Sequence, residues 1–204
     1  GAGTTLADGV KVTDSVVNAG TGALTLTGST TSASYGVNIE KSFGTTQLTG
    51  GTVNVSGTTT TGNYGVRVDR SNVNASNGLS LGSTNARVII EGGTLSASGG
   101  NLLVQGHSAS SLSFPNALKI QDVSATPSLI QHTGAGTVTL QGELTSHSTS
   151  AGSPSGLLIA NSTISSNTGN ILMTGSTGVT GNVESTTGTQ LASGAVVTSA
   201  GNIS

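Results

Sequence analysis

One short pattern recurs along this chain and limits what the chain can fold into: glycine, any residue, apolar, any residue, apolar, any residue, glycine. Full copies lie at residues 22–28, 51–57, 100–106, 136–142 and 169–175, and a shortened copy lies at 78–82. The closing glycines are 24 to 36 residues apart, and repeats of about 20 to 50 residues are typical of solenoids and arrays. Because a repeat this short cannot bury its own apolar face, we expect the repeats to stack on one another.

Two more strand patterns precede each copy. The first is a triplet with an apolar residue at each end: Val10/Val12, Val37/Ile39, Val66/Val68, Val88/Ile90, Leu118/Ile120 and Leu157/Ile159. In four of the six repeats a single apolar residue follows after four intervening positions, at Val17, Val73, Leu95 and Ile164. Alternation with a period of two indicates β-strands. The sequence therefore predicts three short strands per repeat.

The same alternation predicts which side chains face inward, because successive strand side chains point to opposite faces. The predicted core includes Val53, Val55, Val66, Val68, Leu102, Val104, Val138, Leu140, Ile171 and Met173. A tight interior corner is expected where a small residue follows the second strand, at Ala19, Gly50, Ala75, Ala97 and Ser166. The glycines are expected in turns, where they would supply positive φ angles.

These patterns predict an all-β fold, a single parallel β-helix (β-solenoid) over 1–204 with about three short strands per coil and roughly six to seven coils. The expected coils are 10–28, 37–57, 66–82, 88–106, 118–142 and 157–175, followed by a degenerate coil at 179–204. No capping segment is recognisable at either end. We therefore expect the stack to continue end-to-end, into further coils of a longer chain or into identical subunits.

Composition excludes several classes of function. The chain has 7% charged residues, 2% aromatic residues, no cysteine and a net charge of −2. This charge gives no basic surface for nucleic acid, and no apolar run is long enough for a membrane span. The absence of cysteine excludes a disulfide scaffold.

The glycine-bounded strand, the entries Tyr35-Gly36-Val37 and Tyr64-Gly65-Val66, and the Ser, Thr, Asn and Gly between strands resemble a known family. It is that of the filamentous-haemagglutinin repeat shafts, the two-partner-secretion exoproteins and adhesins of Gram-negative bacteria. The resemblance implies a right-handed parallel β-helix, a secreted or cell-surface location, and adhesion. The Asn-Pro motifs of that family's secretion domain are absent here, which indicates the shaft.

Charged residues concentrate in the first strand of each coil and in the turn after it. Stacking would align Lys11, Asn38, Arg67, Ile89 and Lys119 in one outward column, and Glu40, Asp69 and Glu91 in a second column in the following turn. This surface predicts a lateral contact strip formed by Lys11, Arg67, Asp69, Arg70 and Lys119. A weak cation site made of stacked carboxylates and a solubilising face that discourages sheet association are the alternatives.

Residues 107–155 interrupt the repeat most strongly, with the longest loops of the chain. They contain all three prolines, and His107, Phe114, His132 and His147 are candidate binding residues of these loops. Neutral loop growth, which solenoids tolerate, is the alternative. The histidines lack the spacing of metal ligands, so no metal or other cofactor is expected.

The sequence predicts a structural function: a shaft segment of a secreted or surface-anchored fibrous adhesin. No nucleophile elbow, phosphate loop or paired-histidine motif is present, so no enzymatic activity is expected. A second interpretation is a module that binds a host or cell-surface glycan or protein through 107–155. A third is a phage fibre or tail protein, which would use outward Ile89, Leu103, Leu158 or Leu172 between chains.

Overall fold

The computed structural model describes residues 7–60, 64–108, 116–145, 154–178 and 186–204. All regular structure in these ranges is β-strand, and every pair of named strands runs parallel. The predicted all-β class is confirmed. None of the described residues forms a helix that is long and apolar enough to cross a membrane.

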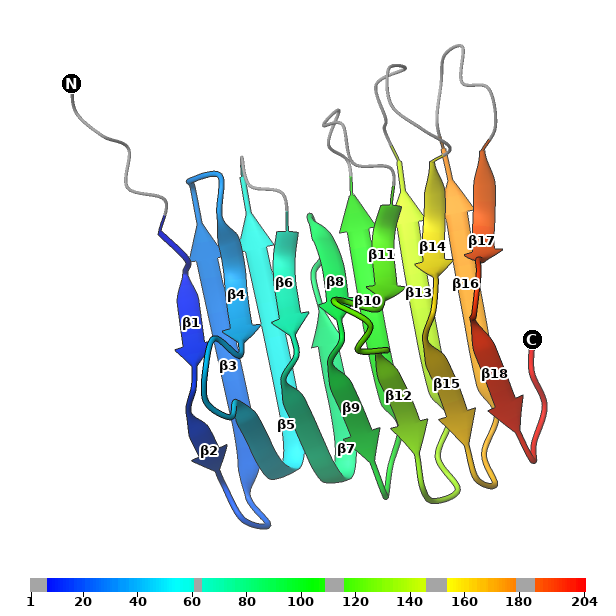
Figure 1. The fold of residues 1–204 in the computed structure, drawn as a ribbon, viewed down its shortest axis with the longest axis horizontal. Helices are drawn as coiled ribbons and strands as arrows, with labels where there is room; N and C mark the ends of the chain where they lie inside the picture. Colours follow the sequence, from blue (N-terminus) through cyan, green and yellow to red (C-terminus); the bar gives the residue numbers. More distant parts are fainter. Residues whose placement is uncertain (1–6, 61–63, 109–115, 146–153, 179–185) are drawn as a thin grey trace.

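One sheet contains a single strand from each coil and follows the chain in order from one end of the stack to the other (Figure 1). We call it sheet A. Its seven strands are β1 (Val10–Thr13), β4 (Tyr35–Glu40), β6 (Tyr64–Asp69), β8 (Arg87–Glu91), β11 (Asn116–Gln121), β14 (Ser155–Ile159) and β17 (Thr187–Leu191).

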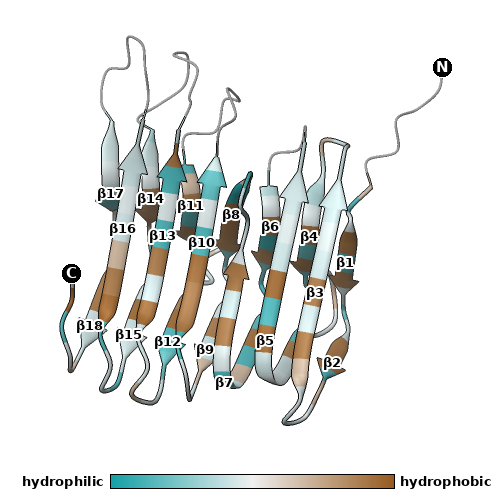
Figure 2. Cartoon of the chain, turned by 180° about the vertical axis from the view of Figure 1, so that it is seen from behind, coloured by the Kyte–Doolittle hydropathy of each residue, from teal (hydrophilic) through white to brown (hydrophobic). Residues whose placement is uncertain are grey.

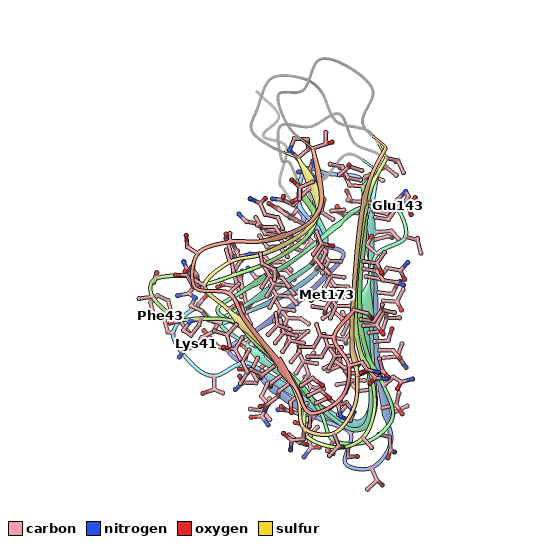
Figure 3. The ribbon with its side chains drawn as sticks, turned by 90° about the vertical axis from the view of Figure 1, so that its right-hand side faces the viewer. Lys41, Phe43, Glu143 and Met173 are labelled. Carbon is pink, nitrogen blue, oxygen red and sulfur yellow. The ribbon has the colours of Figure 1, made fainter. Side chains whose placement is uncertain are left out.

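The second sheet, sheet B, bends around a corner and carries the second and third strands of each coil. In β5 (Gln47–Thr59) and β7 (Asn72–Gly82) these two strands are continuous. Elsewhere they are separate. The second strands are β2 (Val16–Asn18), β9 (Thr94–Ala97), β12 (Leu129–His132), β15 (Thr163–Ser166) and β18 (Val196–Ser199). The third strands are β3 (Ala23–Thr30), β10 (Leu102–Ser108), β13 (Val138–Leu144) and β16 (Ile171–Thr177). Viewed along the stack, the coils superimpose in a three-sided outline (Figure 3). This arrangement is consistent with a parallel β-solenoid.

Equivalent residues of successive coils lie side by side in columns. Val10 pairs with Val37, Val37 with Val66, and Val66 with Val88. All the predicted core residues except Met173 are at most 2% exposed, which confirms their inward assignment. Met173 also points into the interior (Figure 3), but it is only partly buried because it lies close to the last coil.

The column of single apolar residues on the second strand is also complete. Leu48 and Ile130 occupy it in the two coils where the sequence spacing fails. The longer connections that shift them, 41–46 and 122–128, follow β4 and β11. Where the spacing is regular, one residue turns the corner with a left-handed backbone: Asp14, Arg70, Gly92 and Asn161 have φ angles between 45° and 61°.

The 41–46 connection is held by a side chain of the neighbouring coil. The Asp14 carboxylate accepts hydrogen bonds from the backbone N–H groups of Ser42 (2.9 Å), Phe43 (3.2 Å) and Gly44 (2.9 Å). Desolvation opposes the charge, but these three hydrogen bonds hold the pKa of Asp14 below its ordinary value. The Phe43 side chain projects from this corner into solvent (Figure 3).

The closing glycines correct one sequence expectation. They lie within the long strands and not in turns, and their φ angles are not positive. At every closing glycine except Gly82, a side chain would collide with the backbone of sheet A: a Cβ at Gly28 would overlap the Gly36 carbonyl oxygen, and one at Gly57 that of Gly65. These glycines are required because the two sheets approach each other backbone to backbone, not because the chain bends.

Candidate functional site

The predicted charged columns form on the outer face of sheet A. Lys11, Asn38, Arg67, Ile89 and Lys119 are paired in register, and so are Glu40, Asp69 and Glu91. The acids are the last residues of their strands and do not lie in the following turn. Asn38 and Ile89 were expected to be exposed, but both are buried. Ile89 is outside the main apolar core, and its burial removes it as a lateral contact between chains.

Arg67 is the centre of this surface because its guanidinium contacts carboxylates from three successive coils. Its Nη1 lies 3.2 Å from Glu40 in the preceding coil, and its Nη2 lies 3.0 Å from Asp69 in its own coil. Its Nε lies 3.2 Å from Glu91 in the following coil. A planar guanidinium presents several N–H groups at once, so one side chain satisfies all three acids. We call Arg67, Glu40, Asp69 and Glu91 the Arg67 cluster.

Each acid of the Arg67 cluster has a further partner. Lys11 Nζ lies 2.7 Å from Glu40, and Asn38 Nδ2 donates to the same carboxylate at 2.9 Å. The Arg70 guanidinium donates two parallel hydrogen bonds, of 2.9 and 3.1 Å, to the Asp69 carboxylate. The Gln121 amide donates a hydrogen bond of 2.7 Å to Glu91. The hydrogen-bonding capacity of these acids is therefore used largely within the chain.

Two tyrosines border the Arg67 cluster. The rings of Tyr35 and Tyr64 stack with centroids 5.8 Å apart, and the Arg67 guanidinium lies 5.4 Å from the Tyr35 centroid. That distance is typical of a cation–π contact. Burial raises the pKa of both tyrosines. Sequence reasoning did not include these rings in the site, although the repeated Tyr-Gly-Val entry places them in one column.

The surroundings of Glu40 favour its charged form. Burial raises the pKa of Glu40, but hydrogen bonds from Lys11 and Asn38 and the charge of Arg67 outweigh it and hold the pKa below its ordinary value. The hydrogen bond with Glu40 raises the pKa of Lys11. A general acid in glycoside hydrolysis needs the opposite shift. The Lys11–Glu40 contact is therefore an ion pair between two charged groups.

The predicted contact strip is only partly assembled. Lys11, Arg67, Asp69 and Arg70 are joined by the ion pairs above, whereas Lys119 makes no ion pair within the described residues and lies between Ile89 and Leu158 in its column. The carboxylates that would form the alternative cation site are already paired with basic groups. No group of acids and histidines among the described residues is arranged to hold a metal ion.

Arg87 is a charged residue that sequence reasoning did not single out. It begins β8 and is 2% exposed. Its Nε donates to the Ser108 hydroxyl at 3.3 Å. Burial lowers the pKa of Arg87 to about 10, against the opposing effect of Tyr64.

The predicted binding-loop residues separate into different environments. His107 lies on β10, and its Nδ1 is 3.1 Å from Glu143 of β13. His132 is buried at the end of β12, in register with Ala97 and Ser166. Its Nε2 lies 2.9 Å from the Gly100 carbonyl oxygen, and its Nδ1 lies 3.1 Å from the Gly134 N–H. It therefore belongs to the interior corner, not to a loop surface. Phe114 and His147 lie outside the described residues.

A shallow groove of about 190 Å³ lies on the outer face of sheet B beside His107 and Glu143. It is lined by Gln105, Gly106, Gln141, Gly142, Glu143, Thr174 and Ser176. These residues lie in the upper parts of β10, β13 and β16, which are polar except for Leu144 at the end of β13, whereas the lower halves of the three strands carry the apolar bands (Figure 2). The Gln105 and Gln141 amides make no side-chain hydrogen bond within the described part of the chain.

Comparisons of the chain with protein-family models, with curated proteins and with solved structures found no match.

Proposed function

We propose that this chain is a structural shaft segment of a secreted or cell-surface fibrous adhesin, folded as a right-handed parallel β-helix. The observation that carries the proposal is the stacking of equivalent residues through seven coils around one apolar core, with local register shifts only at Gly50/Thr52 and Tyr64/Val66 among the described strand pairs. In a stack of this kind each coil contacts only its neighbours. Length can therefore increase without any change in cross-section, which is the property that a shaft requires.

The path of the chain supports the right-handed sense. In Figure 1 the strands of sheet A run down the near side, and the long strands of sheet B return up the far side as the chain advances toward its C-terminal end. The chemistry of the outer faces supports a structural function. The acids of the Arg67 cluster are paired with basic groups of the chain, and these partners hold the pKa of Glu40 below its ordinary value.

Location and shape can be tested together. Antibodies raised against the folded chain would be applied to native cells and followed by immunogold electron microscopy. We expect label along fibres that extend from the cell surface, or on shed fibres in the medium. Label confined to the cytoplasm, or on compact particles without fibres, would contradict the shaft function.

A second candidate function is favoured by the groove on sheet B. Two glutamine amides that make no side-chain hydrogen bond among the described residues, a carboxylate and two hydroxyls line it, and such groups suit a hydroxyl-rich ligand such as a glycan. The test is a glycan array probed with the chain and with Gln141→Ala. The matched control is Gln190→Ala, which removes an outward amide from sheet A. Loss of a signal in Gln141→Ala alone would support the groove, and equal binding by all three proteins would reject it.

A further inference from the structure

The chain contains two tyrosines, Tyr35 and Tyr64, and the fold brings them together. They are paired in register at the start of β4 and β6, the sheet A strands of two adjacent coils. Their rings are stacked, with centroids 5.8 Å apart and an interplanar angle of 21°. Each tyrosine of the chain therefore has the other tyrosine as a ring neighbour.

The surroundings hold both rings in place and leave them within reach of solvent. The Arg67 guanidinium lies 5.4 Å from the centroid of the Tyr35 ring. Gly36 and Gly65, which follow the two tyrosines, lie where the backbone of sheet A is in contact with that of sheet B. Both tyrosines are only partly buried. A small oxidant can therefore reach the phenols, while the paired strands keep the rings side by side.

We infer that Tyr35 and Tyr64 form a site of oxidative cross-linking, at which a dityrosine bond joins two adjacent coils. The oxidant is hydrogen peroxide acting through a peroxidase. This inference goes beyond the shaft function and does not depend on it.

The reaction takes one electron and one hydroxyl proton from each phenol, which leaves two tyrosyl radicals. The radicals combine through a bond between ring carbons that adjoin the hydroxyl-bearing carbons. The hydrogen on each bonded carbon then moves to the phenol oxygen as a proton, so that both rings are aromatic again. Hydrogen peroxide takes up the two electrons and the two released protons and becomes two molecules of water.

Proximity decides which partner a tyrosyl radical meets first. In-register strands place equivalent residues about 4.8 Å apart, and groups held this close react as parts of one molecule without the cost of a random encounter. Burial raises the pKa of both phenols, so each phenol is protonated at neutral pH and releases that proton when it is oxidised. The chain has no Trp or Cys that competes for the oxidant.

The cross-link gives the chain a covalent constraint of a kind that cysteine cannot supply here. No cysteine is present, so no disulfide can join the coils. A bond between Tyr35 and Tyr64 closes the segment between them into a loop, and a closed loop restricts the unfolded chain as a disulfide does. The expected consequence is that two coils near the start of the stack are held together after oxidation.

The test is treatment of the purified, folded chain with hydrogen peroxide and a haem peroxidase. Trypsin cleaves after Lys11, Lys41 and Arg67, so the two tyrosines fall in separate peptides, 12–41 and 42–67. We expect these peptides to be joined, with the mass of their sum less two hydrogen atoms, and the chain to stay monomeric on a denaturing gel. The same treatment in urea should lower the yield of the joined peptides at least about tenfold.

Two variants separate this pairing from chance coupling. Tyr64→Phe keeps an aromatic ring at its position and should give no joined peptides. Tyr64→Phe with Asn54→Tyr keeps two tyrosines in the same two peptides but moves one to the outer face of sheet B, and it should give none either. The inference is overturned by no coupling, by coupling only between chains, or by equal yields in the folded and urea-treated chain. A yield in the Asn54→Tyr variant equal to that of the unmodified chain also overturns it.

Discussion

The backbone oxygen of Gly65 occupies the space that a side chain on Gly57 would need. Similar contacts join Gly28 to Gly36 and Gly142 to Gly156. At these glycines the backbones of sheet A and sheet B are in contact. No side chain fits between the two sheets there, so the solenoid is as narrow as two packed backbones permit. The closing glycine is therefore a packing requirement in five of the six repeats, with Gly82 as the exception.

Replacing Gly57 with alanine should destabilise the fold by about 3 kcal/mol or more, because a backbone atom would have to move. Gly78→Ala is the matched control. It changes a glycine in the interior of β7, and a Cβ there would have its nearest neighbour at 3.5 Å. Urea unfolding followed by circular dichroism measures both. Equal urea midpoints for the two variants would show that sheet A and sheet B can move apart at Gly57 without a loss of stability.

Val55→Asp should cost about 4 kcal/mol or prevent folding, because it buries an unpaired charge in the core. Asn54→Asp, one residue earlier on the same strand, points the new carboxylate outward and should change stability by less than about 0.5 kcal/mol. The comparison is made by chemical denaturation. A larger loss in Asn54→Asp would mean that the strand register is displaced by one residue.

Arg67→Met should lower the free energy of unfolding by about 2 kcal/mol, since three carboxylates in adjacent coils lose their shared partner. The Arg67 side chain is 20% exposed, so solvent screening reduces this loss below that of a fully buried pair. Lys119→Met removes a cation from the same column that has no ion pair among the described residues, and should have little effect. Similar unfolding midpoints for both variants would rule out a stabilising role for the Arg67 cluster.

Stability should fall in acid partly through Glu40. Its folded pKa is below the ordinary value of 4.5, so its stabilisation is fully present above that value and is lost as the pH falls through the folded pKa. Urea midpoints measured from about pH 6 to about pH 3 should drop less steeply in Glu40→Gln than in the unmodified chain. Identical slopes would show that Glu40 has the same pKa in the folded and unfolded states.

His132→Ala should cost about 2 kcal/mol, because a buried side chain is lost and the Gly100 carbonyl and Gly134 N–H groups lose its hydrogen bonds. His107→Ala, which removes a histidine from the outer surface, should cost less than about 0.5 kcal/mol. Thermal unfolding of the two variants provides the measurement. An unchanged melting temperature for His132→Ala would imply that the corner repacks around alanine, as it does around Ala97 in the preceding coil.

The strand pattern could be predicted because the inward residues are all of one chemical kind. Val53 and Val55 occupy equivalent places to Leu102 and Val104, so a period of two identifies the core. The columns of Lys11 and Glu40 follow from the same register. Burial of Asn38 and Ile89 could not be predicted in this way, since it depends on how the side chains beside them lie on the sheet. The sequence spacing also did not identify Leu48 and Ile130 as members of the second-strand column. Insertions at the preceding corner change their distance along the sequence from the first strand, but they do not change their position in the column.

His132 shows a second limit of sequence patterns. The small residues Ala75, Ala97 and Ser166 predict a small corner, and a histidine breaks that rule. It is accommodated because two backbone groups hydrogen-bond to its ring. Contacts of this kind depend on the loop that follows β12, and no periodicity in the sequence reveals them.

The three-coil reach of Arg67 has a consequence for how the chain finds its fold. Every coil offers nearly the same aliphatic columns, so the core alone would accept a chain that had slipped by one whole repeat. Arg67 meets an acid on each side only when the coils of Glu40, Asp69 and Glu91 are stacked in sequence order. A slipped chain would leave these charges without their partners. The apolar core would be similar in the correct alignment and in one shifted by a whole repeat. The Arg67 ion pairs form only in the correct alignment, and they therefore favour the native order of the coils during folding.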